Sequence, residues 1–375
     1  CFLCLTGEMM KGLYIHIPFC VKKCRYCDFT SFADKADCFD LYVKQLMCEM
    51  EQYRGEGIDT VFIGGGTPTV MSAKQLEKII GACFKNFNIS SDYEFSVEAN
   101  PGTLDDEKIK TLLNSGANRI SVGVQSFNDN ELKTLGRIHS ARSAYNTVCR
   151  LHELGFLNIN ADIMTALPSQ TEEMLLKTAD RLLELPLMHI SAYSLIIEDG
   201  TPMAEDYKNG QLNLPDEDSD RHMYAALSEK LAQNGFNRYE ISNFAKDGFE
   251  CRHNKKYWQC REYIGLGTAA HSYIGNERFS NTSSLSEYLS GKYCRNTEVL
   301  TKADKIEEFI IMGLRMRCGI SEAEFMRRFN KSFAETYKNQ LEKFINGGFM
   351  KAENGRFCLT AKGADVSNSI MCEFI

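Results

Sequence analysis

The chain has 375 residues, enough to bury a large core, and its 43% hydrophobic and 25% charged residues are ordinary for a soluble globular protein. Its net charge of −7 does not favour nucleic acid as a partner, and no apolar run is long enough to span a membrane. The 15 cysteines lie mostly singly in apolar or helical stretches, which argues against a disulfide framework and predicts a reducing compartment, hence the cytoplasm.

Short apolar runs alternate with helical patterns through the first half of the chain. The helical patterns are expected to begin at caps such as Ser72, Thr103 and Ser140. β-branched and aromatic residues, bounded by Gly or Pro, predict six strands over residues 12–18, 60–66, 93–99, 119–125, 157–167 and 189–196.

Six successive βα units predict parallel strands joined by right-handed crossovers. Either an open doubly wound sheet or a barrel satisfies this pattern. A cysteine-containing loop follows the first strand, where a dinucleotide fold would carry a glycine-rich motif. We therefore expect an α/β fold built on a partial (β/α)6-type parallel barrel, with its site where the carboxyl ends of the strands meet.

The pattern changes after the last predicted strands. We expect an N-terminal extension over residues 1–10, the barrel core over 11–245, an aromatic and Gly-rich connecting segment over 246–300, and a C-terminal domain over 301–375. The C-terminal pattern of helices, a hairpin and a last helix predicts an α+β winged-helix-like domain. Such domains often bind nucleic acid, but the acidic balance favours a packing or lid role. The C-x-x-C pair of Cys1 and Cys4 is interpreted as a spectator.

Three cysteines follow the first strand at spacings of four and three residues: Cys20, Cys24 and Cys27. A structural zinc site needs a fourth ligand, usually from a second pair, and no such pair follows within the next hundred residues. A [4Fe–4S] cluster fits better, because cysteine thiolates hold its irons. Three thiolates then leave one iron free to bind a chelating small molecule. Unrelated core or zinc cysteines are the alternative.

Later strands also end in residues suited to a ligand. The stretch FIGGGTPT over residues 62–69 lets the backbone approach a ligand, although a tight turn would need glycines too. Glu98, Gln125 and Asp162 lie on later strands, and an acid in an apolar strand is costly to bury unless it is paired or bound. Arg137 could pair with a carboxylate. A common ligand with amino and hydroxyl groups, or separate core salt bridges, would account for them.

The cysteine spacing after a strand resembles the signature of radical S-adenosylmethionine (SAM) enzymes. Together with GGGTPT, SVEANPGT, GVQSF and LGRIH, it resembles the oxygen-independent coproporphyrinogen III oxidase family from about Tyr14 to the C-terminus. The resemblance implies a [4Fe–4S] cluster on the three cysteines, SAM chelating the open iron, and one-electron cleavage to a 5′-deoxyadenosyl radical. It implies SAM contacts at Tyr14, Tyr26 (against adenine), Gly65, Gly66, Thr67, Glu98, Gln125, Arg137 and Asp162.

The family that this chain resembles has two branches. The true oxidase, which decarboxylates propionates to vinyl groups, has a further cysteine after C-x-x-C and a long N-terminal arm. Here Asp28 and Phe29 follow Cys27, and only about a dozen residues precede the first strand, which favours a shorter branch of haem chaperones. The segment CRHNKKYW over residues 251–258 resembles that branch.

The resemblance to this branch implies haem as cargo, haem-accepting partner proteins and an electron donor. Peripheral membrane contact and enzymatic activity are left open. His253 and His16 are candidate haem ligands, with Cys251 a weaker one. His271 is interpreted as structural.

Overall fold

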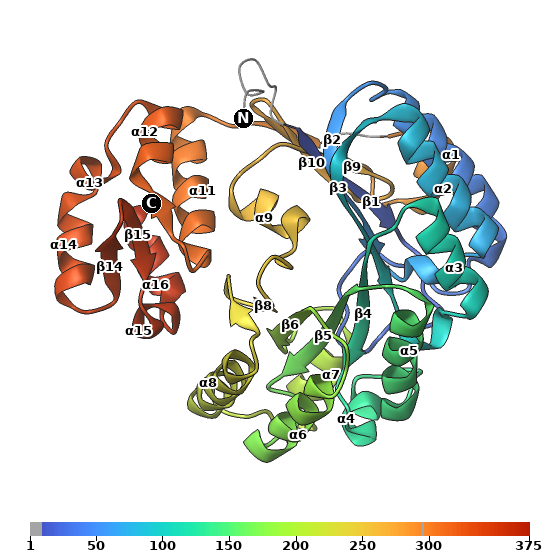
Figure 1. Ribbon diagram of the computed structural model, residues 1–375, viewed down its shortest axis with the longest axis horizontal. Helices are drawn as coiled ribbons and strands as arrows, with labels where there is room; N and C mark the ends of the chain where they lie inside the picture. The colour runs from blue at the N-terminus through green and yellow to red at the C-terminus, as the bar shows by residue number, and fades with distance from the viewer. Residues whose placement is uncertain (1–9, 294–295) are drawn as a thin grey trace.

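The structure, a computed structural model, describes residues 10–293 and 296–375. The predicted N-terminal extension, apart from Met10, and the Cys1–Cys4 motif therefore lie outside the described residues. Six parallel strands stand side by side in chain order, as the barrel prediction required (Figure 1). They are β1 (Lys11–Ile17), β2 (Gly57–Gly65), β3 (Asn88–Ala99), β4 (Arg119–Gln125), β5 (Asn158–Thr165) and β6 (His189–Ser194).

The helices that connect the parallel strands cover only the outer face of this curved sheet, so it is a partial barrel and not a doubly wound sheet (Figure 1). The helices between the strands are α1 (Phe39–Glu51), α2 (Ala73–Asn86), α3 (Asp106–Ser115), α4 (Asp129–Thr134), α5 (Ala141–Leu154) and α6 (Glu172–Leu183), followed by α7 (Pro202–Lys208) and α8 (Glu217–Gln233). Ser72 and Ser140 cap their helices as predicted. Thr103 does not cap α3, because its hydroxyl donates to Asn100 O at 2.9 Å, and Asp105 caps that helix instead.

The two faces of the sheet differ in polarity because side chains alternate along a strand. On β4, Ile120, Val122 and Val124 are fully buried in the main hydrophobic core. Arg119 and Ser121, which alternate with these residues along the strand, line a cavity on the opposite face. The sheet therefore has an apolar side packed against helices and a polar concave side available to a ligand.

Further strands extend the sheet at both edges. The hairpin of β7 (Asn237–Arg238) and β8 (Asn243–Ala245) adds antiparallel strands beyond β6. At the other edge, β9 (Tyr263–Leu266) pairs in parallel with β1, followed by β10 (His271–Ile274), β11 (Glu277–Ser280) and β12 (Asn296–Val299). The segment over residues 246–300, which we expected to connect two domains, thus also supplies four strands to the core sheet. A short helix, α10 (Leu285–Leu289), lies between β11 and β12.

Helix α9 (Arg252–Trp258) lies on the concave side of the sheet, between the barrel and the C-terminal domain (Figure 1). Its own N-cap residue, Cys251, provides no side-chain cap. The carboxylate of Glu94 on β3 accepts the backbone N–H groups of Arg252 and His253, each at 3.0 Å. A strand residue therefore takes the role of the helix cap and places α9 over the cavity.

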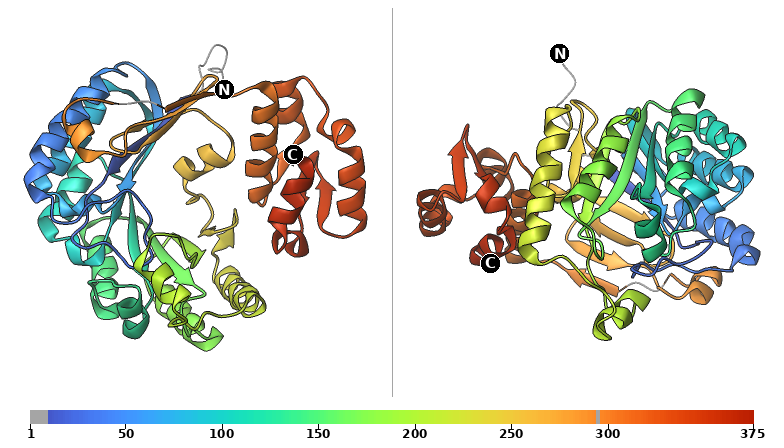
Figure 2. Two further views of the ribbon diagram at one scale, coloured as in Figure 1. Left: turned by 180° about the vertical axis from the view of Figure 1, so that it is seen from behind. Right: turned by 90° about the horizontal axis from the view of Figure 1, so that it is seen from below.

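The C-terminal domain has its own core and confirms the predicted winged-helix-like arrangement. It lies beside the open side of the barrel in both views of Figure 2. A two-residue turn at Asn354 and Gly355, both with positive φ, joins the strands of the predicted hairpin. Its elements are α11 (Lys302–Arg315), β13 (Ile320–Ser321), α12 (Glu322–Phe329), α13 (Phe333–Thr336), α14 (Lys338–Asn346), β14 (Met350–Glu353), β15 (Arg356–Leu359), α15 (Ala361–Ala364) and α16 (Ser367–Met371).

A polar contact joins this domain to the barrel. Arg278 on β11 donates two parallel hydrogen bonds to the Glu308 carboxylate on α11, at 2.6 and 2.7 Å. Within residues 10–293 and 296–375, every helix is too short or too polar to cross a lipid bilayer. A packing or lid role for the domain stays a prediction.

Candidate functional site

The three cysteines lie in the loop that follows β1, and each is a partly buried free thiol. Backbone hydrogen bonds anchor this loop at two points: Cys20 N–H donates to Phe32 O at 3.1 Å, and Arg25 N–H donates to Leu135 O at 3.1 Å. The loop thereby lies over the carboxyl ends of the strands, where the barrel prediction expected the site.

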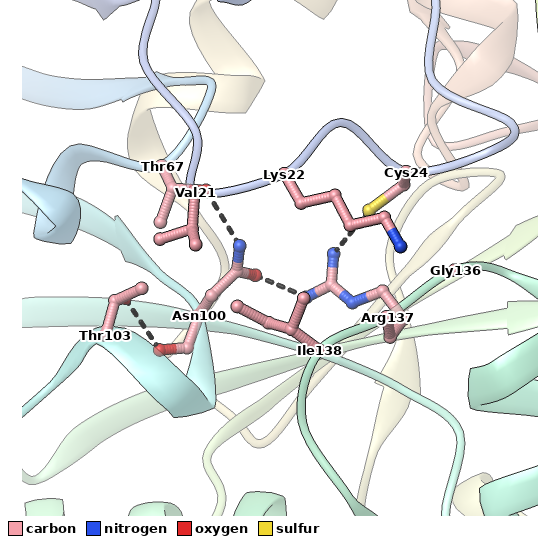
Figure 3. A pocket seen from close by; sticks show the side chains of 9 residues that line it. All are labelled: Val21, Lys22, Cys24, Thr67, Asn100, Thr103, Gly136, Arg137 and Ile138. Carbon is pink, nitrogen blue, oxygen red and sulfur yellow. Dashed lines mark hydrogen bonds between the residues drawn. The ribbon is translucent and has the colours of Figure 1, made fainter. Parts of the chain in front are cut away.

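Two predicted residues contact the thiols directly. Arg137 Nη1 donates to Cys24 Sγ at 3.3 Å, and the hydroxyl of Thr67 lies 3.7 Å from Cys20 Sγ. Figure 3 shows Arg137 below the loop, bonded both to Cys24 and to the side-chain oxygen of Asn100. The bond to Arg137 fixes the position of the Cys24 sulfur, the atom through which a cysteine binds a metal.

The donor set fits a [4Fe–4S] cluster better than zinc. Burial raises the pKa of the Cys20 and Cys27 thiols, and their neighbouring thiolates add to the shift, so bound cations would favour ionisation. Among the described residues, no three His, Cys, Asp or Glu side chains are close enough to hold a single ion, as tetrahedral zinc would require. In a four-iron cluster each thiolate binds a different iron, so its sulfurs stand further apart.

The glycine-rich turn brings the end of β2 against this loop. Gly65 has φ of +110°, and a Cβ there would lie 2.5 Å from the His16 ring. A Cβ on Gly66 would lie 2.6 Å from Phe19 O, and Thr67 N–H donates to that same carbonyl at 2.7 Å. Only glycines allow this close approach. The Gly65 N–H donates to Glu98 Oε2 at 3.1 Å, which links the turn to the cavity inside the barrel.

A cavity of about 170 Å³ occupies the concave side of the sheet below the turn. Three predicted SAM contacts line it: Tyr14, Glu98 and Asp162. Burial, reinforced by the charge of Asp162, raises the pKa of Glu98 to about 8, although the Gly65 N–H opposes the shift. Glu98 therefore carries a proton at neutral pH and can donate as well as accept a hydrogen bond.

The remaining predicted SAM contacts lie around Arg137. Tyr26 is adjacent to the Arg137 guanidinium and packs in a small apolar cluster with Leu135 and Met203. The Gln125 amide nitrogen lies near Gly123, whose carbonyl accepts from Arg137 Nη2 at 2.8 Å. The structure thus gathers the predicted residues into two adjoining groups: the cysteine loop with Arg137, and the cavity with Glu98.

Asp162 is held by neighbours that the sequence analysis did not identify. Its two carboxylate oxygens accept from Asn160 Nδ2 and Ser121 Oγ, both at 2.8 Å. Asn160 Oδ1 lies 2.6 Å from Nδ1 of His189, and Nε2 of His189 lies 2.9 Å from the Tyr239 hydroxyl. Burial holds the pKa of His189 well below its usual value, so the ring is neutral, donates through Nδ1 and accepts through Nε2.

A signal for these residues was present in the sequence. Ser121 and Asn160 lie an even number of positions before Gln125 and Asp162, and therefore on the same face of their strands. Counting back in steps of two along each strand also reaches Arg119. The inner face as a whole could have been predicted in this way, but its hydrogen-bond partners could not.

Both candidate haem-ligating histidines are engaged in the structure. Nδ1 and Nε2 of His253 lie 3.0 Å from the Thr60 hydroxyl and 2.9 Å from the Tyr257 hydroxyl, respectively. Nδ1 of His16 lies 3.0 Å from the Tyr14 hydroxyl, and its Nε2 lies 2.8 Å from Thr30 O. Binding iron would require either ring to give up one of these bonds, and both histidines stay candidate haem ligands.

The weaker candidate ligand, Cys251, and the predicted structural residue His271 differ in exposure. Cys251 is buried, and its thiol donates to Glu94 Oε1 at 3.6 Å. His271 is exposed on β10. Its structural role stays a prediction.

Comparisons with known proteins agree with this geometry. The sequence profile of the radical SAM superfamily matches residues 14–182, and that of the HemN C-terminal domain matches residues 300–366. The solved structure of the coproporphyrinogen III oxidase HemN from Escherichia coli superimposes with a TM-score of 0.84 at 23% identity, over 97% of this chain and 90% of that one. The fold and the cysteine loop thus define a radical SAM protein.

Three relatives show which family of radical SAM proteins includes this chain. Heme chaperone HemW of Lactococcus lactis is 40% identical over 97% of this chain and 97% of its own length. The heme chaperones HemW of Bacillus subtilis and Escherichia coli are 36% and 32% identical, over 98% and 97% of this chain and 99% and 98% of their own lengths. The chain belongs to the HemW family.

Proposed function

We propose that this protein is a haem chaperone that binds a [4Fe–4S] cluster and SAM and transfers haem to target proteins. The observation that carries the proposal is the 40% identity, over nearly the full length of both chains, to a relative named heme chaperone HemW. The proposed partners are haem, haem-accepting proteins and an electron donor. Peripheral contact with a membrane would depend on where those acceptors lie.

Cys20, Cys24 and Cys27 are the proposed cluster ligands. A bound, reduced cluster together with SAM supplies one-electron chemistry. The chain contributes Arg137, whose guanidinium donates to Cys24 Sγ at 3.3 Å and to the Gly123 carbonyl at 2.8 Å. This arginine therefore ties the cysteine loop to the carboxyl end of β4.

The proposed SAM contacts differ in what they offer a ligand. The proton on Glu98 would leave when an ammonium group binds beside it, because an adjacent cation favours the carboxylate. Asp162 is oriented by hydrogen bonds from Asn160 and Ser121, which suits its carboxylate to accept hydrogen bonds from hydroxyl groups. The other proposed contacts are Tyr14, Tyr26, Gly65, Gly66, Thr67, Gln125 and Arg137.

The proposed location is the cytoplasm. All 12 cysteines of the described residues are free thiols, which is typical of proteins in a reducing compartment. The boundaries between extension, core, connecting segment and C-terminal domain that we drew at residues 10, 245 and 300 are proposed as the functional division of the chain.

The test compares cluster-loaded protein with one cysteine variant. We expect anaerobically purified protein to show the broad visible absorbance of an iron–sulfur cluster, and C24S to lose it. The matched control is C48S, since Cys48 is an exposed thiol on α1. Cluster-loaded protein should then bind haem, and incubation with SAM should leave coproporphyrinogen unchanged, as followed by mass spectrometry.

The alternative function is that of a true oxidase. The superposition with HemN shows a shared fold, and at 23% identity it carries no activity over to this chain. Conversion of coproporphyrinogen to protoporphyrinogen in the same incubation would contradict the chaperone assignment and favour the oxidase.

A further inference from the structure

The cavity contains a buried cation at its base. Arg119 is the first residue of β4, its side chain is 1% exposed, and it lines the 170 Å³ cavity. It is the largest fully buried side chain of the described residues. Arginine keeps its charge in proteins, so this is a full positive charge removed from water.

The guanidinium of Arg119 has few partners. Its Nη1 lies 3.4 Å from Ser96 Oγ, and its Nε is buried without a hydrogen-bond partner. In the described part of the chain, no carboxylate oxygen approaches it within the 4.0 Å of an ion pair. A guanidinium has five N–H donors, and a buried charge without a counter-ion is strongly unfavourable.

The acidic side chains nearby are already engaged. Glu94 accepts two backbone N–H groups of α9, and Asp162 accepts from Asn160 and Ser121. Burial disfavours the charge of Arg119, but Cys251, Glu94, Tyr239 and Asp162 outweigh burial and raise its pKa. Burial raises the pKa of Cys251 and Tyr239, so both are neutral at neutral pH and supply no counter-ion, which leaves the guanidinium donors to bind an anionic ligand.

The size of the cavity limits what can enter. It is smaller than the roughly 300–1,000 Å³ pockets that enclose drug-sized ligands. A carboxylate on a short aliphatic arm would fit, whereas a whole macrocycle would not. Phe62 and Tyr257 provide aromatic walls, and Tyr193, 42% exposed, marks the side that is open to solvent.

We propose that Arg119 binds a propionate carboxylate of the haem cargo, with the macrocycle outside the cavity on the side of Tyr193. This inference rests on the proposed haem-chaperone function. A planar guanidinium pairs with a carboxylate through two parallel hydrogen bonds, which also orients the arm. Binding would give the buried charge the counter-ion that the chain itself does not provide.

The test compares haem with haem dimethyl ester, which lacks the propionate charge. We expect R119M to weaken haem binding at least about tenfold, because it removes a buried charge pair. The same variant should bind the dimethyl ester as the unchanged protein does. R119K, which keeps the charge but not the planar fork, should be intermediate. The matched control is R142M, since Arg142 is exposed at the start of α5.

Stability and SAM affinity separate the outcomes. Replacing an unpaired buried charge with an apolar side chain is not expected to lower the thermal unfolding midpoint, so R119M should be at least as stable as the unchanged protein. Equal haem affinity in both proteins, or an R119M chain that fails to fold, would overturn the inference. A loss of SAM affinity without a loss of haem affinity would assign the carboxylate to SAM and overturn it too. If the unchanged protein binds neither porphyrin, the proposed function itself fails.

Discussion

The carboxylate of Glu94 accepts a hydrogen bond from the backbone nitrogen of His253 at 3.0 Å, although the two residues are 159 positions apart. The same carboxylate accepts from Arg252 N–H, so one side chain of β3 satisfies two free donors of α9. This bond fixes the helix that forms one wall of the cavity.

Replacing Glu94 should therefore loosen α9. We expect E94A to lower the free energy of unfolding by about 1–3 kcal/mol, because two N–H groups lose a charged acceptor. Amide hydrogen exchange should accelerate selectively in residues 252–258. E107A is the control, since Glu107 is exposed in the first turn of α3, away from α9. Equal protection of α9 in both variants would show that Glu94 does not hold the helix.

Replacing Arg137 should release the cysteine loop. This side chain bonds Cys24 Sγ, Asn100 Oδ1 and Gly123 O, and lysine cannot reach all three. We expect R137K to take up less iron during anaerobic reconstitution and to be cleaved faster by protease within residues 20–29. R142K, on the exposed face of α5, should match the unchanged protein in both measurements. Normal iron content in R137K would contradict the role of Arg137.

The buried histidines predict a loss of stability in acid. Burial lowers the pKa of His16 and His189, brings that of His139 to about 4 and, with the nearby charge of Lys256, that of His253 to about 3. Below pH 6.5 the unfolded chain binds protons at these rings and the folded chain does not. Their contribution is therefore complete above about pH 6.5 and is lost as the pH falls.

Urea unfolding measured between about pH 7 and pH 5 should show this loss, with up to about 1.4 kcal/mol per pH unit from each histidine. Replacing the exposed His152 with glutamine should leave the dependence unchanged, whereas H253Q should make it shallower. A free energy of unfolding that does not change over this range would contradict neutral, buried rings.

Glu98 predicts the opposite dependence above neutral pH. Its pKa is raised to about 8, mainly by burial, so the folded chain keeps a proton that the unfolded chain loses above its ordinary pKa of 4.5. The stability it contributes is complete below pH 4.5 and is lost as the pH rises through about 8. Because a single proton titrates, the effect is limited to about 1.4 kcal/mol per pH unit.

This dependence can be isolated with a neutral isostere. E98Q should remove the decline in the free energy of unfolding between about pH 6.5 and pH 8. E107Q, at an exposed position of α3, should retain it. The two predictions together place maximal stability near neutral pH.

Local patterns were sufficient for the parallel sheet and for the candidate cluster ligands. The alternation of apolar strands and helices depends on neighbours a few residues apart, so six strands and their order could be predicted. Cys20, Cys24 and Cys27 lie within one loop, and their spacing alone indicated a centre with a free position. The polar inner face could have been predicted from the same period of two.

Contacts between distant segments were decided only by the tertiary structure. The pairing of β9 with β1, the capping of α9 by Glu94 and the unpaired charge of Arg119 each join residues that no local period relates. His253 illustrates the difference, because its motif suggested a haem ligand, while the fold places Thr60 and Tyr257 on its two ring nitrogens. Sequence periodicity shows which face of a strand is polar, but the partner of each polar group depends on how the whole chain closes around it.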